Sequence, residues 1–105
     1  MKLRIRSEGF RVTAALDEFV RQRLRYALGR FQDAVEHVAV RLRDDNGPRG
    51  GVDKHVQLQV RVRGRAPVLI EERGHDLYAA IGRGSQRAER QVIRSIERRR
   101  TTWRP

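Results

Sequence analysis

Four short stretches of the chain alternate apolar and polar residues. They read KLRIR (2–6), HVAVRLR (37–43), HVQLQVRVRG (55–64) and VLIEER (68–73). Because successive side chains of a strand point to opposite faces, each stretch predicts a strand with one buried side. The residues expected on that side are Leu3, Ile5, Val38, Val40, Leu42, Val56, Leu58, Val60, Val62, Val68 and Ile70. Residues 44–54, rich in Gly, Asp and Asn, predict a mobile hairpin connection, and residues 64–67 predict a turn.

Two other segments repeat their apolar residues every three or four positions, as amphipathic helices do. In the first, Thr13 is placed as an N-cap, and Asp17 and Glu18 follow where carboxylates suit the helix dipole. Its apolar positions are Leu16, Phe19, Val20, Leu24, Ala27, Leu28 and Phe31. In the second, Asp76 is the expected N-cap, and residues 101–105 are expected to form a disordered tail. The predicted fold is α+β, in the order strand, helix, three strands, helix.

The second helix is expected to present two opposite stripes. With about 100° per residue, its apolar side chains cluster on one side of the helix. They are Leu77, Ile81, Ala88, Val92 and Ile96. On the other side, within an arc of roughly 80°, lies a set that we call the arginine stripe. It consists of Arg83, Arg87, Arg90, Arg94 and Arg98. One side should pack on the sheet, and the other should attract anions.

Glycines interrupt this helix near its start, where residues 81–85 read IGRGS. The segment lacks the third glycine of a dinucleotide fingerprint and the Gly-Lys-Ser/Thr ending of a triphosphate-binding loop. A disordered Arg/Gly tail would not carry the apolar stripe. Within a helix, Gly82 and Gly84 each cost about 1 kcal/mol relative to alanine. Our hypothesis is that they allow close approach of an RNA backbone, and the alternative is that they are simply tolerated.

The net charge of the chain indicates what kind of partner it binds. The chain has 105 residues, enough for one domain, which we place at residues 1–100. Its 24 Lys and Arg outnumber 13 Asp and Glu, for a formal charge of +11, which favours a polyanionic partner or an anionic membrane surface. Only Lys2 and Lys54 are lysines, so the charge is almost all guanidinium, which binds phosphate bidentately. The codon usage of a GC-rich genome would explain the preference for arginine equally well.

Several function classes find no support in the residues. Without cysteine there is no disulfide, thiolate nucleophile or Cys-ligated metal. The three histidines, His37, His55 and His75, fall on three different segments, so no metal site is expected. The adjacent Glu71 and Glu72 point to opposite faces of one strand, so they are not expected to form an acid/base pair. We therefore expect no enzyme activity, cofactor or small-molecule substrate. No apolar run has membrane-spanning length and no signal peptide is recognisable, so we expect a cytoplasmic protein that does not bind membranes.

The outer side of the predicted sheet is also basic. Its arginines, which we call the outer-face arginines, are Arg4, Arg6, Arg41, Arg43, Arg61 and Arg63. They share the face with Gln57, Gln59 and Glu71. We interpret this side mainly as a solvated surface, and the alternative is that it is a surface for RNA in addition to the arginine stripe. Two aromatic residues complete the set of candidates. Tyr78 is expected to pack against the sheet edge, and Trp103 to lie in the tail.

The chain resembles a known family at the start of each predicted helix. The sequence GHDLYAAI at residues 74–81 is close to the Asp-Met-Tyr-Ala-Ala-Ile motif of the ribosome hibernation promoting factor family, also called ribosome-associated inhibitor or sigma factor modulation protein. VTAALDEFV at residues 12–20 is similar to that family's opening of the first helix, and Arg23 stands where a basic residue is usual. The order of elements agrees as well, so the resemblance covers almost the whole chain.

The resemblance implies a fold and a function. It implies a four-stranded sheet with both helices on one face, similar to a double-stranded RNA-binding domain. Such proteins bind 16S rRNA of the small ribosomal subunit in the channel for mRNA and tRNA, block translation and favour stored ribosomes in stationary phase or stress. Carried over by position, the rRNA contacts would be Arg23 and the arginine stripe. Replacing Arg87, Arg90 and Arg94 should then weaken subunit binding while leaving thermal stability nearly unchanged.

The chain also departs from the family pattern. Gly82 stands where many relatives have an acidic residue. With its end at Pro105, the chain resembles the short form, which has no second, ribosome-dimerising domain, and we expect it to be monomeric off the ribosome. Two other functions stay open at this point. One is a general module for structured RNA, and the other is a protein–protein regulator of a transcription factor.

Overall fold

The computed structural model describes residues 1–45 and 53–102, and the side chains up to Arg98. The order of elements is the predicted one, strand, helix, three strands, helix. The elements are β1 (Lys2–Glu8), α1 (Ala14–Leu28), a short 3-10 helix η1 (Gly29–Phe31), β2 (Val35–Asp44), β3 (Lys54–Val62), β4 (Val68–Gly74) and α2 (Leu77–Thr102). Two predicted boundaries were inexact, because Asp44 and Lys54 are paired strand residues and α2 extends to Thr102. Of the predicted loop and tail, residues 46–52 and 103–105 lie outside the described residues.

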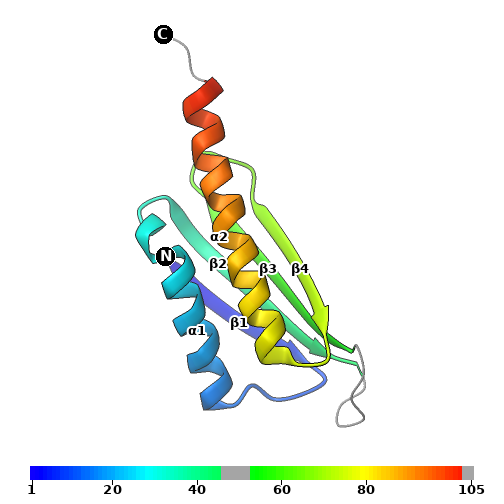
Figure 1. The fold of residues 1–105 in the computed structure, drawn as a ribbon. Helices are drawn as coiled ribbons and strands as arrows, with labels where there is room; N and C mark the ends of the chain where they lie inside the picture. Colours follow the sequence, from blue (N-terminus) through cyan, green and yellow to red (C-terminus); the bar gives the residue numbers. More distant parts are fainter. Residues whose placement is uncertain (46–52, 103–105) are drawn as a thin grey trace.

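The four strands form one mixed sheet in the order β1-β2-β3-β4. β1 runs parallel to β2, to which it is connected through α1, whereas β2, β3 and β4 pair antiparallel. Both helices lie on the same side of the sheet, and α2 runs alongside α1 (Figure 1). The expected α+β fold, with two helices on one face, is therefore confirmed. The opposite face of the sheet is left without a covering layer within the described chain.

The core lies between the helices and the sheet. Every inward position predicted for the central strands β2 and β3 is buried, as are five of the α1 positions, Leu16, Val20, Leu24, Ala27 and Leu28. Fully burying one of the Val or Leu side chains stabilises the fold by about 1.5–3 kcal/mol. Leu3 and Ile5 are only half-buried, because β1 forms an edge of the sheet. The inward side chains of the strands and the apolar side chains of the helices thus pack together in one layer.

Both predicted N-caps are confirmed. The Thr13 hydroxyl accepts a hydrogen bond from the backbone N–H of Leu16 at 3.1 Å. The Asp76 carboxylate accepts hydrogen bonds from the backbone N–H groups of Tyr78 at 2.9 Å and of Ala79 at 3.5 Å. Each cap satisfies N–H groups that have no partner within the helix, and so determines where that helix begins. The start of α2 in turn determines which of its side chains face the sheet.

Candidate nucleic-acid interface

The arginine stripe lies on the exposed side of α2. All five of its side chains are exposed, whereas Ala88 and Val92 on the opposite side of the helix are fully buried. The predicted division of the helix into a core side and a basic side is thus present in the structure. The five arginines nevertheless differ in what they contact.

Arg83 and Arg87 bind to strand β4 through one shared carboxylate. Glu72 accepts a hydrogen bond from Nε of Arg83 at 3.0 Å and one from Nη1 of Arg87 at 2.6 Å. The same two guanidinium groups also donate to the backbone carbonyl oxygens of Arg73, at 3.0 Å, and of Glu71, at 2.7 Å. Both side chains are therefore held along the start of α2. Each of the two guanidinium groups thus directs two hydrogen bonds at strand β4 of its own protein.

The environment of Glu72 keeps its carboxylate ionised. Burial acts to raise the pKa of this carboxyl group, since only 13% of its side chain is exposed. The hydrogen bonds from Arg87 and Arg83, together with the positive charge of both groups, outweigh burial and lower the pKa below 4.5. Glu72 is thus an anion at neutral pH, and it offsets part of the positive charge at this end of the stripe.

Arg90 and Arg94 are placed differently. Together with Arg87 and Gln91 they line a shallow depression on the outer side of α2. Within the described part of the chain, neither Arg90 nor Arg94 has an ion pair or a hydrogen-bonded partner. Arg98 is also exposed and borders a separate depression beside Ser95. The middle of α2 therefore offers two guanidinium groups that are available to an external anion, with a third held beside them by Glu72.

Arg23 lies away from the stripe, in the seam between the two helices. Its Nε atom is buried and has no hydrogen-bond partner among the described residues. Its Nη2 atom lies beside Gly82 of α2, at 3.6 Å from the place where a Cβ atom would stand. The structure thus brings Arg23 close to α2, although not into line with the exposed arginines. A residue larger than alanine at Gly82 would occupy the space of this guanidinium.

The two glycines of α2 face other parts of the protein itself. Gly84 is buried, and a Cβ atom there would lie 3.4 Å from Leu58, 3.6 Å from Glu72 and 3.9 Å from Val56. Its lack of a side chain therefore lets α2 approach the sheet closely. The hypothesis that Gly84 allows approach of an RNA backbone was wrong, because this position points away from the exposed side. Gly82 faces Arg23, so it does not lie on the stripe either.

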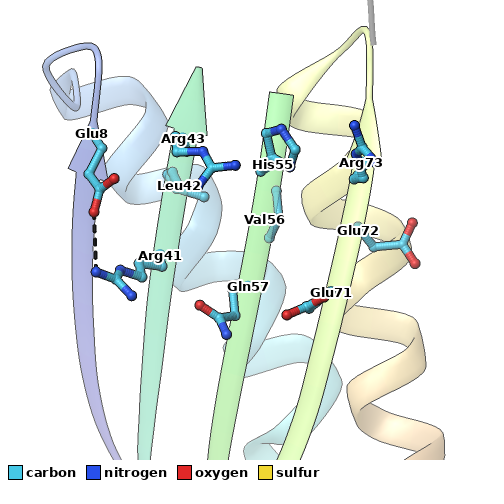
Figure 2. Close-up of a pocket in the computed structure, with 10 residues that line it drawn as sticks. All are labelled: Glu8, Arg41, Leu42, Arg43, His55, Val56, Gln57, Glu71, Glu72 and Arg73. Carbon is cyan, nitrogen blue, oxygen red and sulfur yellow. Dashed lines mark hydrogen bonds and ion pairs between the residues drawn. The ribbon is translucent and has the colours of Figure 1, made fainter. Parts of the chain in front are cut away.

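The outer-face arginines also separate into two groups. Three of them form ion pairs with neighbouring carboxylates, Arg41 with Glu8 at 3.2 Å, Arg43 with Asp45 at 2.9 Å and Arg63 with Glu36 at 3.8 Å. Figure 2 shows Arg41 and Glu8 on neighbouring strands of this face. The other three, Arg4, Arg6 and Arg61, are exposed and have no ion pair within the described residues.

A family model described as sigma 54 modulation protein / S30EA ribosomal protein matches residues 3–100. The chain belongs to this family. Its membership confirms the resemblance that the DLYAAI motif indicates.

Solved structures agree with the S30EA assignment. The N-terminal domain of Protein Y from Thermus thermophilus is 33% identical, with a TM-score of 0.70, and the match covers 89% of this chain and 93% of that one. A ribosomal subunit interface protein from Coxiella burnetii is 18% identical, with a TM-score of 0.73 and coverage of 90% and 96%, which is a likeness of fold. No curated protein matches the chain significantly.

Two further observations describe this S30EA member. In residues 1–45 and 53–98, no group of three or more His, Asp or Glu side chains is arranged to hold a metal ion. None of the described helices combines the length and the apolar character needed to cross a membrane.

Sequence reasoning missed or misplaced three side chains. Tyr78 packs edge-on against Phe19 of α1, with ring centroids 4.7 Å apart, a contact that the prediction of packing against the sheet edge did not include. Tyr26, which lies outside the apolar repeat of α1, is 84% exposed. The anchoring role of Glu72 was also missed. The signal for it was available, because Glu72 is in phase with the inward residues Val68 and Ile70.

Proposed function

We propose that this chain is a ribosome hibernation factor. In this proposal it binds 16S rRNA of the small ribosomal subunit in the channel used by mRNA and tRNA, and so silences translation in stationary phase or stress. Membership of the S30EA family supports a ribosome-associated role. The observation that carries the rRNA contact is the depression on α2, where Arg90 and Arg94 are exposed and available beside Arg87.

The chemistry of this depression suits phosphate. Guanidinium groups donate paired hydrogen bonds to phosphate oxygens and remain charged at every physiological pH. Contacts of this kind position a protein on RNA without reading its sequence. A folded domain held in the channel would then exclude mRNA and tRNA by its volume alone. The proposed mechanism needs no catalytic group, and the protein is expected to act as a monomer when it is off the ribosome.

The test is cosedimentation of the protein with purified small subunits over a range of salt concentrations. The variant Arg90→Gln/Arg94→Gln removes two guanidinium groups that have no partner in the described chain. The control Arg11→Gln/Arg25→Gln removes the same charge from positions outside the stripe. If both arginines contact phosphate, the magnitude of the slope of log affinity against log salt should fall by about 1.4–1.8 in the first variant. A slope equal to that of the control would overturn the assignment of the stripe.

Glu72 changes the choice of variants for this test. The expectation that all of Arg87, Arg90 and Arg94 can be removed with little effect on stability does not suit Arg87, which is hydrogen-bonded to β4. Replacing Arg87 would combine a binding effect with a folding effect. Arg90 and Arg94 separate the two, and an unchanged melting temperature in their double variant is the accompanying control.

A second candidate follows from the family description, which also names sigma 54 modulation. A protein–protein regulator of this kind would use the basic surface for solubility or for an acidic partner. Sedimentation of a stationary-phase lysate distinguishes the candidates. Comigration with small subunits would support the proposal of a hibernation factor, and absence from that fraction at low salt would refute it. Retention of binding to any duplex RNA, without preference for subunits, would instead indicate a general RNA-binding module.

A further inference from the structure

The face of the sheet opposite the helices presents side chains in a regular grid. The strand register places outward residues of β1, β2 and β3 directly beside one another. The three rows are Lys2–His37–Arg61, Arg4–Ala39–Gln59 and Arg6–Arg41–Gln57. No described element covers these rows, since α1 and α2 lie on the other side of the sheet (Figure 1). This grid is therefore a surface distinct from the arginine stripe.

The charges within the grid are poorly balanced. Arg6 stands directly opposite Arg41, and like charges placed opposite one another destabilise a sheet. Glu8 pairs with Arg41 at 3.2 Å, but this bond is exposed and leaves Arg6 without a counterion in the described chain. Arg4 faces Ala39, which offers neither charge nor hydrogen bond. The fold thus keeps a concentration of positive charge that its own packing does not require.

A shallow depression lies at the centre of this grid. The side chains that bound it and carry hydrogen-bonding groups are Arg4, Arg6, His37, Arg41, Gln57 and Gln59. No carboxylate lines it. Glu71 lies one strand further away, opposite Gln57, so the positive side of the face is the part formed by β1 and β2. The depression therefore combines guanidinium and amide donors with no carboxylate in its lining, although Glu8 competes for Arg41 from beside it.

We propose that this depression binds the phosphodiester backbone of RNA. An acidic protein is disfavoured because protein interfaces are built around buried aromatic or apolar anchors, and this depression offers only Ala39 and the buried Val40. Phosphate needs no such anchor, and guanidinium groups bind it through paired hydrogen bonds. The domain would then hold RNA on two opposite sides, with α2 on one segment and the sheet on another. This second surface does not depend on the identity of the RNA bound by α2.

The experiment follows backbone amide NMR signals while a short oligouridylate is added to the full chain. Signals of residues 4, 6, 39, 41, 57 and 59 should shift together, and the Ala39 signal reports the affinity of this surface. In Arg4→Gln/Arg6→Gln the salt slope of that affinity should fall by about 1.4, the value for two contacts to a single strand. The control Arg11→Gln/Arg25→Gln, with the same net charge, should keep its slope. Shifts confined to α2, or equal slopes in both variants, would overturn the proposal.

Two further arms separate the remaining explanations. A glutamate peptide of the same charge should bind the sheet more weakly than oligouridylate, and equal or tighter binding would assign the face to an acidic protein instead. The variant Arg90→Gln/Arg94→Gln should lose the shifts on α2 and keep those on the sheet. If the sheet shifts persist while subunit binding is unaffected by that variant, the function proposed for α2 fails and the second surface stands. Loss of the sheet shifts together with those on α2 would refute an independent surface.

Discussion

The anchoring of α2 by Glu72 can be measured as a coupling free energy. Only 13% of the Glu72 side chain is exposed, whereas 46% of the Arg87 side chain is exposed, and the two are joined by a 2.6 Å hydrogen bond. A hydrogen bond to a charged group contributes about 1.5–3 kcal/mol. Exposed ion pairs contribute about 0.2–1 kcal/mol. Because one partner here is largely but not fully buried and the other is half exposed, we expect a coupling of about 1–2 kcal/mol.

The assay is a double-mutant cycle by urea denaturation at neutral pH. The cycle uses Glu72→Gln, which keeps the size of the side chain, Arg87→Gln, which shortens it, and their combination. The matched control is the cycle of Glu8→Gln and Arg41→Gln, whose ion pair is exposed on both sides, by 55% and 65%. That control should give about 0.2–1 kcal/mol. A coupling at Glu72 no larger than that of the control would refute the reasoning, because burial of Glu72 would then add nothing.

The ion pair of Glu72 and Arg87 should also make the free energy of unfolding depend on pH in the acid range. The folded pKa of Glu72 lies below the value of 4.5 for the free carboxyl group, because its hydrogen bonds to Arg87 and Arg83 outweigh burial. Its contribution to stability is therefore present above pH 4.5 and is lost as the pH falls through the lowered folded pKa. The stability difference between the wild type and Glu72→Gln should shrink over that range. A difference that stays constant as the pH falls below 4.5 would contradict the shift.

Two other predictions concern α2 and the sheet. Gly82→Ala should stabilise the protein by up to about 1 kcal/mol through helix propensity, because a Cβ atom there has ordinary contact distance to Arg23. Gly84→Ala should gain less, because its Cβ atom would meet Leu58 at 3.4 Å, and thermal denaturation of the two variants checks the order. Arg6→Gln should stabilise the fold by about 0.2–1 kcal/mol by removing the like charge opposite Arg41, measured at low salt. An equal gain for both glycines, or a loss at Arg6, would contradict the packing described here.

Much of the fold follows from local patterns. The period-two stretches predicted all four strands, and Thr13 and Asp76 predicted where the helices begin. Each of these signals depends on residues within a few positions of one another, so no tertiary information is needed. The same holds for the two sides of α2, because helical geometry alone places the arginines opposite the apolar residues. The family resemblance likewise rests on a short contiguous motif.

Neighbouring residues in the sequence do not show which arginines of the candidate site are neutralised and which are available to a ligand. Arg83 and Arg87 are separated from Glu72 by 11 and 15 residues, and only the packing of α2 on β4 brings them together. The like-charge pair of Arg6 and Arg41 arises in the same way, from the parallel register of β1 and β2. The sequence by itself determined which residues are charged, which elements they occupy and which side of each element they take. Only the tertiary structure decided which charges are neutralised, because that depends on distances between elements that no local period encodes.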